Sequence, residues 1–451
     1  MNQNNISAAE LFLRVRELLI LPELEPKTRN KMMHDTLILC CHEGVKDTKQ
    51  AFGNLFSQVD YLCKAHGIKV ADKIAIQTMR RHSNSQEPLS SEDLKYDARA
   101  LAIFISAVFG VDVPHELNVL IPHTNRPYQK GLEINNRRIR CIVKNWDSDF
   151  IRVDIDQDAD EEEYLVQLKD EENHIDHTYL WDILKEGMQL NLLDCQVKQP
   201  VITPRLIVVE PDYLVDISSI ATCFTAFGHH PLLYLLNQMK PRANTQATLL
   251  GNFAGAALDD IINTNGKYQM NETIKTNFRE KALEFCTCPW FDAKKFYTDA
   301  NQQAFNLQQV VDILFPRTAS QAQMSAFRGE SLYDRQKAIL EPSFVCEALG
   351  IQGRVDLMTT DCKLLVEQKS GRNMNIETHQ VDPGYHSYQL EPHYVQLLLY
   401  YGVLQHNFKL SNDRVNIRLL YSKYQPQDGL MVVAYYHKLF QEAITYRNQL
   451  V

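Results

Sequence analysis

The stretch GIQGRVDLMTTDCKLLVEQKSG at residues 350–371 decides the fold. It predicts a pair of strands that resembles a β-hairpin, with Asp356 in the first strand and Glu367 and Lys369 in the second. Alternate side chains of a strand point to the same face, so Glu367 and Lys369 are expected together and Gln368 on the opposite side. If the two strands pair, Asp356 reaches the same place.

Asp356, Glu367 and Lys369 are the residue types that metal-dependent phosphodiester hydrolysis needs. Two carboxylates and the backbone carbonyl of Gln368 would form an oxygen cage suited to Mg²⁺ or Mn²⁺. Such a cation polarises the scissile phosphate and lowers the pKa of a bound water. The Lys369 ammonium could orient that water or neutralise developing negative charge. We therefore predict that these three side chains are catalytic.

An exposed salt bridge is the ordinary alternative for an Asp in one strand and a Glu-x-Lys in the next. The neighbouring residues favour the metal site, because Val355 and Leu357 flank Asp356 and the apolar triplet 364–366 precedes Glu367. Charged groups at the ends of apolar, buried strands are costly unless they are paired or bound to a metal.

Three short motifs resemble those of a nuclease superfamily. GRVD at 353–356 and EQKSG at 367–371 resemble motifs II and III of the PD-(D/E)xK nucleases, in their RecB-like branch. QLLLY at 396–400 matches the Q-x-x-x-Y motif of that branch, and on a helix its Gln and Tyr share one face. The resemblance implies a restriction-endonuclease-like core in which the metal is held by Asp356, Glu367 and Gln368. The candidates that it implies for DNA binding are Gln396, Tyr400, Arg354 and Ser370.

A longer stretch narrows this resemblance. LIVVEPDYL at 206–214, followed by SSIA at 218–221, resembles the segment that joins the barrel to the nuclease domain in flap-processing nuclease-helicases of DNA replication and end resection. In outline the resemblance covers residues 125–451. It implies a metal-dependent nuclease that acts on single-stranded or flap DNA, in replication or repair, with a helicase motor as its partner.

The sequence departs from that family at the metal site. There a helix contributes G-x-x-x-H, whose His is a further ligand, whereas GNFAG at 251–255 places Gly255 at that position. Asp259 and Asp260, one turn further on, are candidates for the missing ligand; the alternative is that both lie on a solvated helical face. If neither reaches the metal, the chain would be a catalytically weakened DNA-binding module that guides a helicase.

Two further parts of the family pattern are missing. Many relatives hold an iron–sulfur cluster with one upstream and three downstream cysteines. Here no cysteine follows Cys362, and Cys223 is out of register, so no cluster is expected within this chain. The helicase motif G-x-x-x-x-G-K-[ST] is absent, because Gly266-Lys267 lacks the upstream glycine. We therefore expect the motor in a longer parent chain or in a separate subunit.

Two regions are expected ahead of the nuclease domain, which would occupy 212–451. Residues 1–118 are typical of a helical region, with apolar side chains at helical spacing and a Ser-Ser-Glu-Asp start before 92–111. Residues 119–211 contain five short strand-like segments and one helical piece. This favours a small OB-like β-barrel, which either binds single strands or serves only for packing. The fold class is α/β.

Helices and strands alternate in the pattern of 212–451. Helices are expected at 218–239, 249–263, 302–314, 332–340 and 392–404. Strands are expected at 353–358, 364–368, 418–422 and 429–436, before a terminal helix.

Charge, cysteine spacing and apolar runs restrict the classes of protein to which this chain can belong. The net charge of −9 is unusual for a nucleic-acid binder, because phosphate contacts need Lys and Arg. Many of the acidic residues lie in 154–172, with an extreme run at 158–163. The negative net charge is therefore compatible with one local basic groove that binds nucleic acid. Ten cysteines at irregular spacing and no signal-peptide pattern indicate a cytoplasmic protein. Apolar runs such as 18–21 and 397–401 are too short to span a membrane, so no membrane partner is expected.

Overall fold

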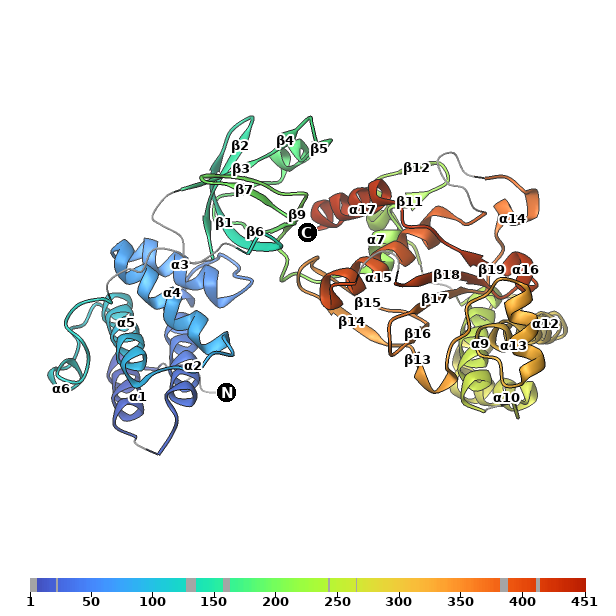
Figure 1. Ribbon diagram of the computed structural model, residues 1–451, viewed down its shortest axis with the longest axis horizontal. Coiled ribbons are helices and arrows are strands. Elements are labelled where there is room, and N and C mark those ends of the chain that lie inside the picture. The colour runs from blue at the N-terminus through green and yellow to red at the C-terminus, as the bar shows by residue number, and fades with distance from the viewer. Residues whose placement is uncertain are drawn as a thin grey trace. The chain divides into compact units, whose positions relative to one another are not determined.

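The computed structural model describes residues 6–21, 23–126, 135–156, 163–241, 244–264, 266–381, 388–410 and 414–451. The chain forms two compact units, 1–212 and 213–451 (Figure 1). Helices and several sheets are both present, so the fold is mixed α/β, as predicted. Of the acidic run at 158–163, only Glu163 belongs to the described residues.

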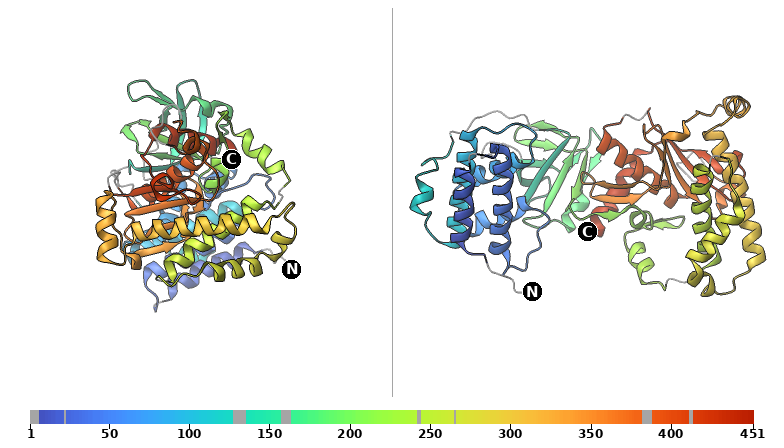
Figure 2. Two further views of the ribbon diagram at one scale, coloured as in Figure 1. Left: turned by 90° about the vertical axis from the view of Figure 1, so that its right-hand side faces the viewer. Right: turned by 90° about the horizontal axis from the view of Figure 1, so that it is seen from below.

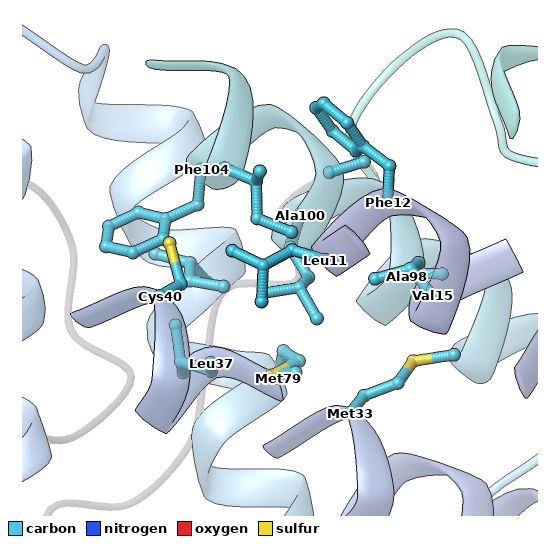
Figure 3. Close-up of a cluster of buried hydrophobic side chains, with 14 of the residues drawn as sticks. Leu11, Phe12, Val15, Met33, Leu37, Cys40, Met79, Ala98, Ala100 and Phe104 are labelled. Atoms are coloured by element: carbon cyan, nitrogen blue, oxygen red, sulfur yellow. The ribbon is translucent and has the colours of Figure 1, made fainter. Parts of the chain in front are cut away.

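A bundle of helices begins the first unit. Its helices are α1 (Ala8–Ile20), α2 (Pro26–Val45), α3 (Leu55–Ala65), α4 (Val70–Asn84), α5 (Ser91–Phe109) and the short α6 (His115–Asn118). Apolar side chains of these helices form one core, in which Leu11, Met79 and Phe104 lie close together (Figure 3). α5 begins where the Ser-Ser-Glu-Asp signal predicts, because Ser90 and Asp93 cap each other's backbone N–H groups.

A seven-stranded sheet with its own apolar core follows in the same unit. In spatial order its strands are β7 (Gln196–Lys198), β8 (Val201–Thr203), β3 (Tyr164–Gln167), β2 (Phe150–Ile155), β1 (Arg138–Trp146), β6 (Gln189–Leu193) and β9 (Leu206–Val209). Five strands were expected. One of the two extra strands arises because Asp194, at φ 49°, separates β6 from β7. The pair β4 (Lys169–Asp170) and β5 (Ile175–Asp176) and a 3₁₀ turn (Thr178–Asp182) complete the unit.

Ion pairs join the bundle to the sheet within the first unit. Lys73 Nζ of α4 lies 2.5 Å from Asp60 Oδ1 of the bundle and 2.9 Å from Asp154 Oδ2 of β2. Arg80 of α4 pairs with Asp156, directly after β2. These half-buried pairs help to explain why two separate cores form one compact unit.

A five-stranded sheet is the base of the second unit. In spatial order its strands are β13 (Ala338–Leu340), β16 (Leu357–Thr359), β17 (Leu364–Lys369), β18 (Asn416–Tyr421) and β19 (Leu430–Val432). β16 and β17 are antiparallel, whereas β17 and β18 are parallel, so the chain crosses over the sheet between them. A three-stranded sheet contains β10 (Val215–Asp216), β15 (Ile351–Arg354) and β14 (Ser343–Cys346).

Helices pack against both faces of β17. On one face α9 (Gln246–Asn263) packs beside α10 (Met270–Glu280) and α12 (Ala293–Leu314), and the core there includes Leu364 and Val366 (Figures 1 and 2). On the other face lies α15 (Glu391–Phe408), which also contacts α7 (Ile217–Ala221) and α17 (His437–Leu450). The shorter helices are α11 (Ala282–Cys286), α13 (Ala319–Phe327), α14 (Met374–Thr378) and α16 (Pro426–Gly429). No helix in the described ranges has the length and apolar character needed to cross a membrane.

Two expected helices of this unit are wrong. The range 218–239 is not one helix but α7, the hairpin β11 (Phe224–Thr225) and β12 (Gly228–His229), and α8 (Leu232–Met239). α7 ends at Ala221, and Gly228, at φ 148°, lies in the hairpin that follows it. The range 332–340 contains a short 3₁₀ turn (Arg335–Lys337) followed by β13, because pairing with β16 outweighs its helical periodicity.

Candidate functional site

Asp356 lies at a break between two strands, which corrects the prediction of one strand over 353–358. β15 ends at Arg354 and β16 begins at Leu357, and the two strands belong to different sheets. The backbone N–H of Gln368 donates to Asp356 Oδ2 over 2.5 Å, which fixes the carboxylate beside β17. The backbone carbonyl of Asp356 accepts from the N–H of Glu341 at 2.9 Å.

Glu367 and Lys369 share one face of β17, as alternation predicts. Lys369 Nζ lies 2.8 Å from Glu367 Oε1 and donates to Gln396 Oε1 of α15 over 2.9 Å. Glu367 is only 2% exposed, and its second oxygen, Oε2, is buried without a hydrogen-bond partner among the described residues. The Gln368 side chain points to the other face, where its Nε2 donates to Ser422 Oγ at 2.8 Å.

Three carboxyl groups at this site have raised pKa values. Burial, followed by the negative charge of Asp356, raises the pKa of Glu367 to about 8, although Lys369 opposes the shift. Burial also raises the pKa of Asp356. Burial, then the charges of Glu341 and Asp356, raises the pKa of Asp259 to about 6. A cation placed among these groups would remove much of this electrostatic cost.

Of the two candidate ligands on α9, Asp259 is the one whose raised pKa has the negative charge of Asp356 among its causes. The Asp260 carboxylate instead accepts a hydrogen bond from the hydroxyl of Thr273 on α10. Asp260 therefore belongs to the contact between α9 and α10 rather than to the carboxylate group.

α9 also carries the glycine that stands where the resemblance implies a histidine. Gly251, Gly255 and Asp259 are spaced four residues apart and share one face of the helix. A Cβ at Gly251 would lie 3.1 Å from Ser370 Oγ, directly after β17. A Cβ at Gly255 would meet no atom within 4 Å, so this position between Ser370 and Asp259 has room for a side chain.

Glu341 is a site residue that the sequence analysis missed. It lies in the turn between β13 and β14 with a left-handed backbone (φ 48°). Its carboxylate oxygen Oε2 is 3.0 Å from Arg354 Nη1, and its negative charge contributes to the raised pKa of Asp259. No motif spacing indicated it; the signal was only an acidic residue beside Pro342 upstream of β15. Arg354, predicted to bind DNA, therefore already has an acidic partner.

Gln396 and Tyr400 lie one turn apart on α15, and Gln396 is the one that accepts a hydrogen bond from Lys369. Tyr400 is buried, and its hydroxyl donates to the backbone carbonyl of Arg354 over 2.6 Å. A Cβ at Gly353 would approach the Tyr400 ring to 3.0 Å, so the glycine lets this ring pack against β15. In this geometry Tyr400 supports the strand that leads into Asp356.

The donor chemistry of these residues fits a hard divalent cation. Asp356 and Glu367 supply carboxylate oxygens, and the buried, unpartnered Oε2 of Glu367 is an oxygen that a cation could satisfy. Within the described ranges, however, no three His, Cys, Asp or Glu side chains are arranged so that they could hold one ion together. A full coordination shell would therefore need backbone carbonyls, water or substrate phosphate beside these two carboxylates.

No family model matches the chain, and no curated protein matches it significantly.

Proposed function

We propose that this chain is a metal-dependent deoxyribonuclease of the PD-(D/E)xK type that acts on single-stranded or flap DNA. In this proposal 213–451 contains the nuclease core, and the seven-stranded sheet of the first unit corresponds to an OB-like barrel. The observation that carries it is the placement of buried Glu367 next to Lys369 and Asp356 on adjacent segments. An isolated buried carboxylate is costly, so such a cluster is typical of a catalytic or metal site.

Asp356 and Glu367 are the residues that would hold Mg²⁺ or Mn²⁺. The bound cation would polarise the scissile phosphate and lower the pKa of its water. Asp259 and Glu341 provide further negative charge near Asp356, which would increase the affinity for a divalent ion. Burial of Glu367 strengthens this attraction, because water screens it less there.

Lys369 is positioned to act on the attacking water or on the phosphate. Its ammonium has three N–H donors, of which Glu367 and Gln396 engage two. The third has no partner among the described residues and could bind a water or a phosphate oxygen. Because both partners fix the ammonium beside Glu367, little ordering remains to be done when substrate arrives.

The direct test is cleavage of labelled single-stranded and flap DNA with Mg²⁺ or Mn²⁺. We expect the wild type to cleave both substrates, and Lys369→Ala to be slower by a factor on the order of 10²–10³, as when one preorganised donor is removed. Lys363→Ala is the matched control, because this exposed lysine directly precedes the same strand and its ammonium lies 3.9 Å from the carboxylate of Asp361. Absence of cleavage by the wild type, or equal rates for wild type and Lys369→Ala, would contradict the proposal.

A second candidate function is a DNA-binding module that guides a helicase without cleaving. Gly255 favours it, since the side chain that would complete the ligand set is missing. This candidate predicts strand binding without turnover. Calorimetric titration with Mn²⁺ separates the two: tight binding that is lost in Asp356→Ala supports the nuclease, and no heat of binding in the wild type supports the module. For either function the helicase motor stays a prediction.

A further inference from the structure

A cavity of about 450 Å³ lies directly beside Lys369 and Gln396. Its wall is formed mainly by α7, the β11 strand, α8 and the first two turns of α15, all within the second unit. This volume lies in the range of pockets that hold small organic ligands. Lys369 therefore has the catalytic carboxylate Glu367 on one side and this cavity on another.

The cavity wall combines an apolar surface with a few polar groups. Phe224, Leu233 and Leu236 supply the apolar part. The Phe224 ring is held in place by His229 and Tyr446, whose ring centroids lie 4.8 Å and 5.3 Å away. The polar part of the wall includes a second lysine, Lys240, and hydroxyl and amide groups at Ser218, Thr222, Thr225 and Asn237. Flat apolar contact with a few hydrogen-bonding groups is what a nucleobase needs.

His393 of α15 lines the cavity with an imidazole ring. Burial, with the nearby Lys369 charge, lowers the pKa of His393 to about 3, so its imidazole is uncharged near neutral pH. The Tyr421 hydroxyl accepts from the N–H of Leu390 at 3.1 Å and lies 2.9 Å from His393 Nδ1. If this hydroxyl donates to Nδ1, the ring proton is on Nε2, which has no partner among the described residues. Such a donor suits a base carbonyl or ring nitrogen.

We propose that this cavity receives the base of an unpaired nucleotide next to the scissile phosphate. The inference deepens the proposed function and rests on it, because Lys369 and Gln396 belong to both the cavity and the catalytic cluster. A base in a duplex is stacked and paired, so it would first have to leave the helix. The cavity thereby gives a physical reason for selecting single strands and flaps.

An abasic scan tests the position of the base. A labelled single strand of fixed sequence carries one abasic nucleotide at each position in turn, and cleavage is mapped bond by bond. We expect cleavage to fall about tenfold at the bond next to the abasic nucleotide, as when one base loses its stacking surface. Bonds further away should keep their rates. Equal cleavage at every bond of every abasic strand would overturn the proposal.

Filling the cavity tests the same site without relying on cleavage. Leu236→Trp should fill it and weaken binding of a single strand containing 2-aminopurine about tenfold, measured by the fluorescence of that base in Asp356→Ala protein. Leu235→Trp is the control, because Leu235 is similarly exposed on α8 (49% against 55%) but does not line the cavity. Equal affinities of the two tryptophan variants would overturn the inference.

These experiments distinguish failure of the nuclease proposal from failure of the base-pocket proposal. If the wild type does not cleave but binds 2-aminopurine in a manner that only Leu236→Trp disrupts, the base pocket is supported and the nuclease proposal fails. If the wild type cleaves and Leu236→Trp cleaves single strands as fast as Leu235→Trp does, the nuclease proposal stands and the base pocket fails.

Discussion

At the residue scale, Glu367 is a buried carboxylate whose two oxygens differ in their hydrogen bonding. Its side chain is almost wholly buried, one oxygen meets Lys369, and the other has no hydrogen-bond partner in the described part of the chain. If Glu367 had only a structural role, burying an apolar side chain at this position would cost less free energy. A cation bound there would satisfy this oxygen and offset the buried charge.

Replacing Gly255 should improve metal binding. Gly255→His adds a ligand type at a position where a Cβ meets no atom within 4 Å and which lies one turn from Asp259. We expect Mn²⁺ affinity to rise, measured by calorimetry. Gly255→Ala is the control, because it should only stabilise the helix, by about 0.5–1 kcal/mol. Equal Mn²⁺ affinities of the His and Ala variants would show that the position does not reach the metal.

Removing the Tyr400 hydroxyl should loosen the strand that leads into Asp356. Tyr400→Phe deletes the hydrogen bond to the Arg354 carbonyl and should lower the free energy of unfolding of the second unit by about 1 kcal/mol. Urea unfolding measures this. The control Tyr297→Phe, on an exposed side chain with a 3.3 Å bond to Asn271, should change it by less than about 0.5 kcal/mol. Equal losses in the two variants would argue against a supporting role for Tyr400.

At the element scale, a histidine ties the β11–β12 hairpin to two helices. His229 Nε2 lies 2.7 Å from Glu391 of α15, and Nδ1 lies 2.8 Å from Glu442 of α17. Burial opposes protonation, but the hydrogen bonds to both carboxylates outweigh it and raise the pKa of His229. The hairpin and α15 also line the cavity beside Lys369, so this contact fixes two of its walls.

The stability of the second unit should therefore depend on pH through His229. Because the folded pKa is above the unfolded value of about 6.5, the stabilisation is complete below about pH 6.5 and is lost as pH rises through the folded pKa. His229→Gln should destabilise more at pH 5.5 than at pH 9. Urea unfolding at both pH values measures this. A loss that is the same at the two pH values would contradict it.

Elements with a local signal were predictable, whereas those decided by distant pairing were not. The start of α5 follows from its capping box. β13 could not be found, because its strand conformation depends on β16, which is about twenty residues away in the sequence. The break at Asp356 was equally hidden, since β15 and β16 are assigned to different sheets only by their partners.

Over the whole molecule, the candidate metal residues all lie in one of the two compact units. Mn²⁺ should stabilise only the unit that binds it, by roughly 2.7 kcal/mol at a hundredfold excess over Kd. If the units unfold in separate transitions, scanning calorimetry should show that Mn²⁺ shifts one of them. If they unfold together, the single transition should shift.

Asp356→Ala is the matched variant for this measurement, and Asp361→Ala is its control on the nearby turn. We expect the Mn²⁺ shift to vanish in the first and to persist in the second. An unchanged shift in Asp356→Ala would place the metal elsewhere.

The sequence by itself determined which residues form the candidate centre and that Glu367 and Lys369 share a face, because both follow from local patterns and the two-residue period of a strand. Only the tertiary structure decided that the charges of Asp356 and Glu341 act on Asp259, that Asp260 bonds to Thr273 of α10, and that a cavity lies beside Lys369. These depend on how α7, α8, α9 and α15 pack around β17. Packing of that kind joins residues far apart in the chain, and no local spacing encodes it.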